Sequence, residues 1–313
     1  MINFLQRAIG YALTGDTREQ CLFILHGNGS NGKSTLLNAI TAMFGEDYAI
    51  NTPTETLMAR KGEGVRNDIA ALNGARLVTA IEAEKDQRLA ESLVKGMTGS
   101  DKMTARFLYG EFFSFIPEFK LFLATNHKPQ IKGTDNAIWR RIRLIPFIVT
   151  IDEGEKDKAL PEKLLSELPG ILNWAIEGCL QWQKEGLGVP EEVKAATDEY
   201  RVEMDVMEDY LSERCVRGKG FKELNKEVRE DYKSWCSSAS EKPESPKAFT
   251  IQMNAHGFTT KRSGPNGEYE WHGLKLIRDI DDVVSLNDAA REAIAAIRSS
   301  EASKEDSKLI ELF

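Results

Sequence analysis

The sequence predicts an α/β fold, in which helices cover a parallel sheet, followed by a helical segment and a smaller C-terminal domain. Short apolar runs lie within residues 21–25, 76–84 and 119–126, and uninterrupted runs of this kind are typical of parallel strands buried on both faces. Between the first two runs, residues 36–44 have apolar side chains at helical spacing and end at a glycine. This alternation of strand and helix is the basis for the predicted fold class.

Length and composition limit the class of protein. The 313 residues suffice for one large core and a smaller domain, and contents of 41% hydrophobic and 29% charged residues are ordinary for a globular protein. No apolar run has the length of a membrane span and the N-terminus lacks a signal-peptide pattern, so we expect a location in the host-cell cytoplasm. The net charge of −8 gives no overall attraction for nucleic acid but leaves room for a local basic channel. Four scattered cysteines fit a reducing compartment and argue against zinc: Cys21, Cys179, Cys215 and Cys236.

The first apolar run leads into a stretch that fits the phosphate-loop pattern G-x-x-x-x-G-K-[ST] without a mismatch. Glycines let successive backbone N–H groups surround a polyphosphate, and the following helix adds its positive N-terminal end. The lysine is expected to reach the β- and γ-phosphates and the serine hydroxyl to hold Mg²⁺. We therefore expect ATP and Mg²⁺ to bind. The predicted nucleotide-binding residues are Gly27, Asn28, Gly29, Ser30, Asn31, Gly32, Lys33, Ser34 and Thr35.

The second apolar run ends in two carboxylates, Glu82 and Glu84. After a phosphate loop, a buried strand that ends in acid is where an ATPase holds Mg²⁺ and activates the attacking water. Because strand side chains alternate, both carboxylates would point to the same face. We predict Glu82 as a metal-binding and catalytic residue and Glu84 as its catalytic neighbour; the alternative is a solvated strand end.

Two later sites are less specific. Asn126 follows the third apolar run and could position water beside the γ-phosphate, although an asparagine before a proline-containing turn also suits a loop. Arg140 and Arg141 follow an apolar stretch. They could supply an arginine finger to a neighbouring subunit, or form a basic surface turn.

The sequence of residues 102–115 predicts a β-hairpin whose turn contains Leu108, Tyr109 and Gly110. Lys102, Arg106 and Tyr109 could meet phosphates and stack on bases. We expect the aromatic residues of the second arm to pack in the core instead: Phe112, Phe113 and Phe115.

The order of these parts resembles superfamily III helicases, and it is most similar to the helicase part of phage/plasmid primases, which is related to poxvirus helicase-primases. The similarity rests on the phosphate loop, the Glu82-x-Glu84 strand end, the Gly99-x-Asp101 turn, the Thr125-Asn126 strand end and the arginine-rich stretch 139–147. It extends from Phe4 to about Ile277.

The resemblance implies an AAA+-type ATPase that forms a hexameric ring and moves on single-stranded DNA during replication initiation of a phage, plasmid or other mobile element. It assigns the sensor to Asn126, the trans-acting finger to Arg141 with Arg140, and the pore hairpin to residues 102–115. The implied partners are single-stranded and replication-fork DNA, other copies of the chain, and a primase domain or polymerase. Similar sequences often have lysine where this hairpin has Gly110, which shifts the expected DNA contacts to Lys102, Arg106 and Tyr109.

We predict an ATPase core in residues 1–150, a helical connector in 151–215, a winged-helix-like domain in 216–280 and a polar helical or disordered tail in 281–313. Lys261 and Arg262 on the predicted wing could contact a DNA backbone; the alternative is a wing that docks another protein. The chain could also be part of a longer helicase-primase.

Two other functions fit the same pattern. One is an ATP-dependent loader or packaging motor that does not separate strands, and the other is an origin-binding protein that uses ATP only to assemble. Unwinding distinguishes the helicase from both.

Overall fold

The computed structural model describes residues 1–60, 66–83, 87–133, 136–239, 241–263 and 267–278. It divides into two compact units, unit 1 from Met1 to Met204 and unit 2 from Asp205 onward. This division falls inside the predicted connector 151–215, because the helix that follows Asp205 packs into the core of unit 2. Glu84 and the predicted tail 281–313 lie outside the described residues.

Unit 1 is built on a five-stranded sheet in the order β2-β3-β6-β1-β7, and every neighbouring pair in it is parallel. The predicted α/β class with a parallel sheet is thus confirmed. Strand β1 lies between β6 and β7, and because all five strands are parallel their carboxyl ends lie at one edge of the sheet. The strands are β1 (Leu22–His26), β2 (Ala49–Asn51), β3 (Leu77–Ile81), β6 (Lys120–Thr125) and β7 (Ile142–Pro146).

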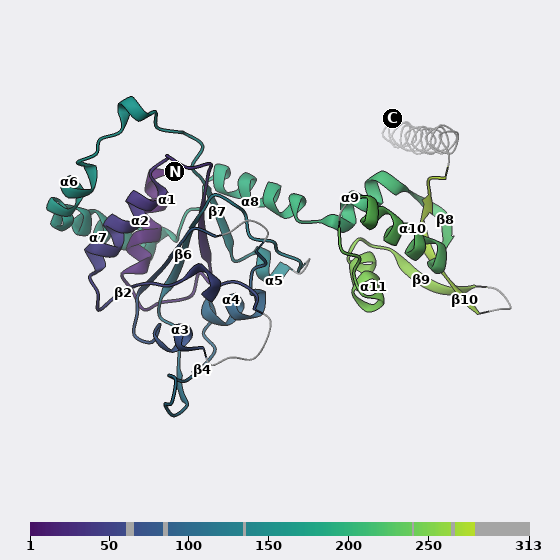
Figure 1. Cartoon of the computed structure of the whole chain (residues 1–313), viewed down its shortest axis with the longest axis horizontal. Coiled ribbons are helices and arrows are strands. Elements are labelled where there is room, and N and C mark those ends of the chain that lie inside the picture. Colours follow the sequence, from purple (N-terminus) through teal and green to yellow (C-terminus); the bar gives the residue numbers. More distant parts are fainter. Residues whose placement is uncertain (61–65, 84–86, 134–135, 240, 264–266, 279–313) are drawn as a thin grey trace, which may run out of the picture. The chain divides into compact units, whose positions relative to one another are not determined.

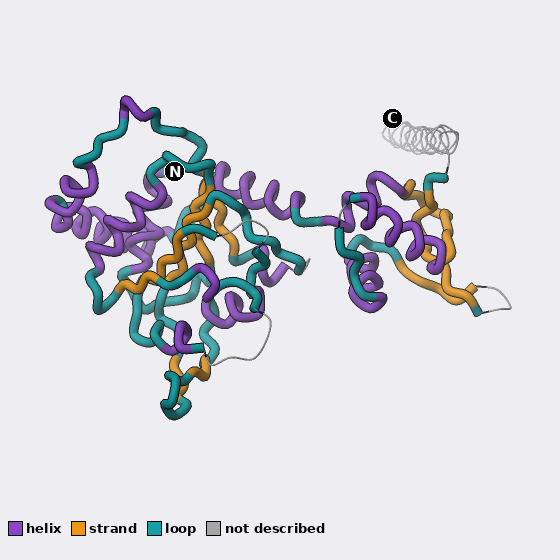
Figure 2. The backbone as a smooth tube through the Cα atoms, in the orientation of Figure 1, coloured by secondary structure: helices purple, strands orange, loops and turns teal. Residues whose placement is uncertain are grey.

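Helices cover both faces of this sheet (Figure 2). Alternate residues of β1 enter different cores: Leu22 and Ile24 belong to one buried cluster, Phe23 and Leu25 to the other. The second cluster includes residues of α1, α2 and α7, and the first includes residues of α4, α5 and α8. The helices are α1 (Ile2–Ala12), α2 (Lys33–Phe44), η1 (Thr54–Thr56), α3 (Asn67–Ala70), α4 (Glu91–Met97), α5 (Asn136–Trp139), η2 (Glu153–Glu155), α6 (Leu160–Ser166), α7 (Leu168–Glu185) and α8 (Glu191–Glu203).

Helices α1 and α7 pack closely because each places a glycine at the contact. A Cβ atom on Gly10 would lie 2.1 Å from the backbone nitrogen of Cys179, and one on Gly178 would lie 2.1 Å from the backbone oxygen of Gln6. A larger residue at either position would push the two helices apart. The N-terminal helix is therefore an integral part of unit 1.

A small antiparallel hairpin extends away from the large sheet (Figure 1). It consists of β4 (Met103–Ala105) and β5 (Phe113–Phe115), with Met103 opposite Phe115. The sequence predicted a hairpin in this stretch, and its two arms pair as expected.

Unit 2 combines three helices with a three-stranded antiparallel sheet in the order β8-β10-β9. Aromatic residues fill its core, where Trp271, Tyr210 and Phe249 are buried and Phe249 lies edge-on to Trp271. Its elements are α9 (Val206–Arg214), β8 (Cys215–Leu224), α10 (Asn225–Ser238), α11 (Pro246–Ala255), β9 (Thr259–Ser263) and β10 (Glu268–Leu276). Across the described residues, each helix is either too short or too polar to cross a membrane.

Candidate functional site

The phosphate-loop sequence forms the connection between strand β1 and helix α2. Gly29 and Gly32 have φ values of +96° and +83°, and a Cβ atom on either would meet no atom within 4 Å. Both glycines therefore adopt the left-handed backbone conformation that the turn requires, and both leave open space beside the loop. The backbone of the loop is therefore accessible to a ligand at these two glycines.

Lys33, the first residue of α2, is the centre of the site. Its side chain is buried, and its Nζ donates hydrogen bonds to the Gly27 carbonyl at 2.7 Å, to Asn31 Oδ1 at 2.9 Å and to Asn126 Oδ1 at 3.0 Å. Burial lowers the pKa of this ammonium group from its ordinary value. It also lowers the pKa of His26 at the end of β1, and the charges of Lys128 and Lys33 lower it further. Both effects favour the neutral form of the His26 imidazole.

A cavity of about 240 Å³ brings together residues from three parallel strand ends. The phosphate loop follows β1, Glu82 follows β3 and Asn126 follows β6, and all three line the cavity together with Ser34. Glu82 has a φ of +67°, and its backbone nitrogen donates to the Ala124 carbonyl at 2.9 Å. The unusual backbone conformation of this exposed glutamate is typical of functional residues.

The structure therefore places Lys33, Ser34, Glu82 and Asn126 in one cavity, as the sequence predicted for a nucleotide site. Ser34 and Glu82, the predicted metal ligands, supply the hard oxygen donors that Mg²⁺ prefers. Within the described part of the chain, no group of three or more His, Cys, Asp or Glu side chains forms a metal site of its own. A single carboxylate beside a phosphate loop suits an ion that phosphate oxygens help to hold.

The segment that follows β7 also contacts the phosphate loop, which sequence reasoning missed. Asn31 Nδ2 donates to the Phe147 carbonyl at 3.1 Å, and the Ile151 backbone nitrogen donates to the Ser30 carbonyl at 2.7 Å. These contacts use backbone atoms of Phe147 and Ile151, so the side chains of that segment carry no signal of them. Of the two contacts, one uses a side chain, that of Asn31 inside the phosphate-loop pattern.

The two adjacent arginines have different environments. Arg141 is 8% exposed, and its guanidinium donates to Thr98 Oγ1 at 3.1 Å and to the Ala137 carbonyl at 2.6 Å. An arginine finger must extend out of its own subunit, so this position corrects the assignment to Arg141, which here supports the interior of unit 1. Arg140 is exposed and donates to Gln20 Oε1 at 2.7 Å. Of the two predicted arginines, Arg140 alone is accessible to a second subunit.

At the hairpin, Tyr109 is fully exposed with a φ of +63°, and Lys102 is also exposed. The Arg106 guanidinium lies 4.7 Å from the centre of the Phe112 ring. Phe112 is 65% exposed, so its predicted burial is wrong, whereas Phe115 is buried. The hairpin tip lies beyond the sheet, with no core available to cover Phe112.

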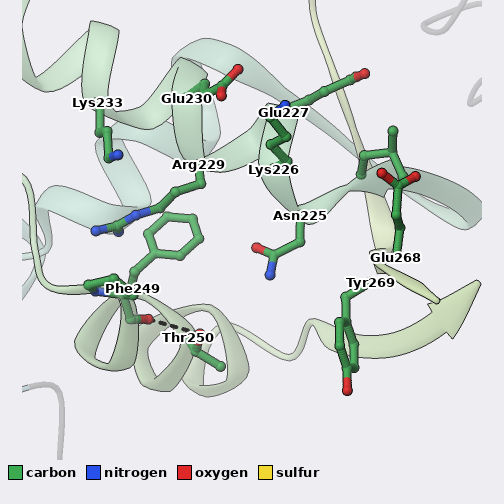
Figure 3. A pocket seen from close by; sticks show the side chains of 12 residues that line it. Asn225, Lys226, Glu227, Arg229, Glu230, Lys233, Phe249, Thr250, Glu268 and Tyr269 are labelled. Atoms are coloured by element: carbon green, nitrogen blue, oxygen red, sulfur yellow. Dashed lines mark hydrogen bonds between the residues drawn. The ribbon is translucent and has the colours of Figure 1, made fainter. Parts of the chain in front are cut away.

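In unit 2, Lys261 and Arg262 are exposed neighbours on β9 and therefore point to opposite faces of the strand. Neither lines the cavity of about 590 Å³ between α10, α11 and β10. Figure 3 shows the Asn225 amide pointing into this cavity between Phe249 and Tyr269. Its charged lining is balanced, which does not match a phosphate backbone: Lys226, Arg229, Lys233, Glu227, Glu230 and Glu268.

Residues 25–141 match a family model described as a family of unknown function, DUF5906. This span begins near the end of β1 and ends at Arg141, so it contains the whole phosphate loop and every residue that lines its cavity. A solved structure, the apo form of the NrS-1 C-terminal region, shares the fold with a TM-score of 0.51 at 12% identity, over 87% of this chain and 71% of that chain.

Viral proteins are also similar to this chain. A protein of Acanthamoeba polyphaga mimivirus named "Putative helicase" is 29% identical over 75% of this chain and 27% of its own length. One of Frog virus 3 with the same description is 29% identical over 67% of this chain and 24% of its own length. A protein of African swine fever virus named "Putative primase" is 25% identical over 64% of this chain and 23% of its own length. This chain thus spans about a quarter of each of these relatives, and it is a homologue of proteins named as helicases and primases of large DNA viruses.

Proposed function

We propose that this chain is the ATP-dependent motor of a DNA helicase that acts in replication. The cavity that joins Lys33, Glu82 and Asn126 carries the proposal, because it combines a phosphate cradle with a carboxylate and an amide at neighbouring strand ends. The names of the viral relatives support the choice of a helicase among the many users of phosphate loops. The fold alone would not make that choice.

In the proposed mechanism, the backbone of residues 27–32 and the Lys33 ammonium hold the phosphates of ATP. Lys33 Nζ already lies among three oxygen acceptors, and phosphate oxygens would replace some of them. Ser34 and Glu82 would hold Mg²⁺, which supplies charge neutralisation for the phosphates. Glu82 would orient the attacking water or accept a proton from it, and Asn126 would position that water beside the γ-phosphate. The role of Glu84 belongs to this proposal on sequence grounds alone.

The remaining roles require several copies of the chain and DNA. We assign the superfamily III, AAA+-type arrangement, in which Arg140 extends toward the nucleotide of a neighbour in a hexameric ring. The hairpin, with Lys102 at its base and Arg106 and Tyr109 in its tip loop, would meet single-stranded DNA in the pore, where the exposed tyrosine can stack on a base. We assign a winged helix to unit 2 from the order of α9, β8, α10, α11, β9 and β10, and we assign Lys261 and Arg262 on its wing to fork DNA. A primase domain or polymerase in the longer protein is the proposed further partner.

The test is an unwinding assay on a forked duplex with ATP and Mg²⁺, alongside ATP hydrolysis with and without single-stranded DNA. A helicase separates the strands and hydrolyses ATP faster with DNA. Stimulation without strand separation would indicate a loader or packaging motor, and assembly without hydrolysis would indicate an origin-binding protein. Either result would contradict the proposal.

A further inference from the structure

Unit 1 has a second, larger cavity that the nucleotide site does not use. It has a volume of about 420 Å³ and lies where α5 and β7 meet α8. Its apolar lining comes from Trp139, Ile142, Val189 and Val193, and its charged lining from Arg140, Arg143, Lys194, Arg201 and Asp198. Four cations against one carboxylate, above an apolar floor, suit a ligand that is both apolar and acidic. We call this the basic cavity.

The same unit exposes a segment of that chemistry. Residues 148–155, here the acidic segment, follow β7; Ile148 is 87% exposed and Val149 71% exposed. Asp152 and Glu155 are exposed too, and in the described residues neither forms an ion pair, whereas Glu153 pairs with Lys156 at 2.5 Å. The two adjacent aliphatic side chains leave apolar area in water, and the neighbouring carboxylates carry the negative charge that complements the basic cavity.

None of residues 148–155 lines the basic cavity, and in Figure 1 the segment between β7 and α6 arches toward α6 and away from α5. A contact between the two surfaces therefore joins different copies. Such a head-to-tail contact leaves one surface of each kind free on every added copy, so it continues until a ring closes.

We propose that the acidic segment of one copy docks into the basic cavity of the next. Ile148 and Val149 cover the apolar floor, and Asp152 and Glu155 face Lys194 and Arg201 on α8. This inference rests on the proposed ring-forming motor, and it specifies which surfaces join the copies.

The contact would also explain how one copy reaches the nucleotide of another. The acidic segment is tied to its own phosphate loop through the Phe147–Asn31 and Ile151–Ser30 hydrogen bonds. Arg140 lines the basic cavity. A copy that holds its neighbour's acidic segment therefore carries Arg140 to the vicinity of the neighbour's phosphate loop.

Charge reversal on each surface tests the proposal in the full-length chain. One variant combines Lys194→Glu with Arg201→Glu, and the other combines Asp152→Lys with Glu155→Lys. We expect each variant alone to lose about tenfold or more in self-association with ATP and Mg²⁺, measured as particle mass against concentration. An equimolar mixture should recover assembly, because each variant keeps the surface that the other has lost. The matched control, Lys219→Glu with Lys222→Glu on exposed positions of β8, should assemble as the unmodified chain does.

The proposal is overturned if either reversed variant assembles normally, if the mixture stays dissociated, or if the unmodified chain does not self-associate. Binding of a fluorescent ATP analogue to each variant is measured in parallel. Because neither reversal changes the phosphate loop, each variant should still bind the analogue. If the unmodified chain binds the analogue but does not assemble, the docking contact alone is refuted. Failed nucleotide binding by the unmodified chain refutes the proposed motor instead.

Discussion

Replacing Arg141 by alanine is expected to destabilise unit 1. The guanidinium is buried and donates to Thr98 Oγ1 and the Ala137 carbonyl. Hydrogen bonds from a charged group contribute about 1.5–3 kcal/mol each. With some replacement by water in the vacated space, we expect the free energy of unfolding to fall by about 2–5 kcal/mol, which corresponds to a fall in Tm of roughly 5–15 °C for a domain of this size.

Arg140→Ala is the matched control, because it removes the same side chain from the adjacent, exposed position. Its effect on unfolding should stay within about 0.5 kcal/mol. Urea unfolding followed by circular dichroism measures both variants. If Arg141→Ala unfolds like the unmodified chain but loses ATP hydrolysis only in the assembled state, Arg141 is the finger after all and our interpretation of its burial is wrong.

Glu82→Gln should retain ATP binding but lower the rate of hydrolysis by about 10²–10⁴-fold, because the water-activating carboxylate is lost. Single-turnover kinetics at saturating ATP measure this rate, and an unchanged rate would remove Glu82 from the mechanism. Tyr109→Ala should weaken single-stranded DNA binding by about 1–3 kcal/mol, the value of one stacked base, with no change in unfolding since the side chain is fully exposed; equal affinity in fluorescence anisotropy would argue against stacking. The hydrogen bond to Asp205, with the charges of Asp205 and Glu208, raises the pKa of His256. The interaction of protonated His256 with these carboxylates should therefore stabilise unit 2 fully below a pH of about 6.5. This stabilisation should disappear as the pH rises through the raised folded-state pKa of His256. His256→Gln should remove that pH dependence from urea unfolding, and a persistent dependence would show that another group causes it.

The phosphate loop and its cavity were accessible to sequence reasoning for a physical reason. In a parallel sheet, the carboxyl ends of neighbouring strands lie at one edge, so polar residues after three apolar runs must come close together. Lys33, Glu82 and Asn126 were predicted in this way, and the structure places all three around one cavity. Their chemical roles stay predictions.

Burial of individual side chains was less predictable. Arg140 and Arg141 are adjacent and chemically identical, yet one is exposed and the other hydrogen-bonded inside the unit. Which of them faces inward depends on where α5 ends and β7 begins. Phe112 likewise belongs to an aromatic run, but its position on the hairpin loop places it away from any core.

Unit 2 shows a second limit. The local pattern of residues 221–236 favours one helix, whereas strand β8 occupies Cys215–Leu224 and α10 begins at Asn225. Glycines and charged residues dominate that strand, and pairing with β10 rather than local pattern stabilises it. Residues 190–213 likewise have the polar pattern of one long helix, but α8 ends at Glu203 and α9 starts anew after Asp205, whose side chain accepts from the Glu208 backbone nitrogen. Asp205 followed by Glu208 is a helix-start signal that could have revealed the break.

The most direct test of the central claim is the rate of ATP hydrolysis with and without single-stranded DNA, compared between the unmodified chain and Lys33→Met. Lys33→Met removes the ammonium that the structure places among three oxygen acceptors in the cavity. We predict hydrolysis that increases with DNA in the unmodified chain and is abolished in the variant. Equal hydrolysis by both proteins, or turnover that DNA does not change, would contradict a DNA motor driven from this cavity.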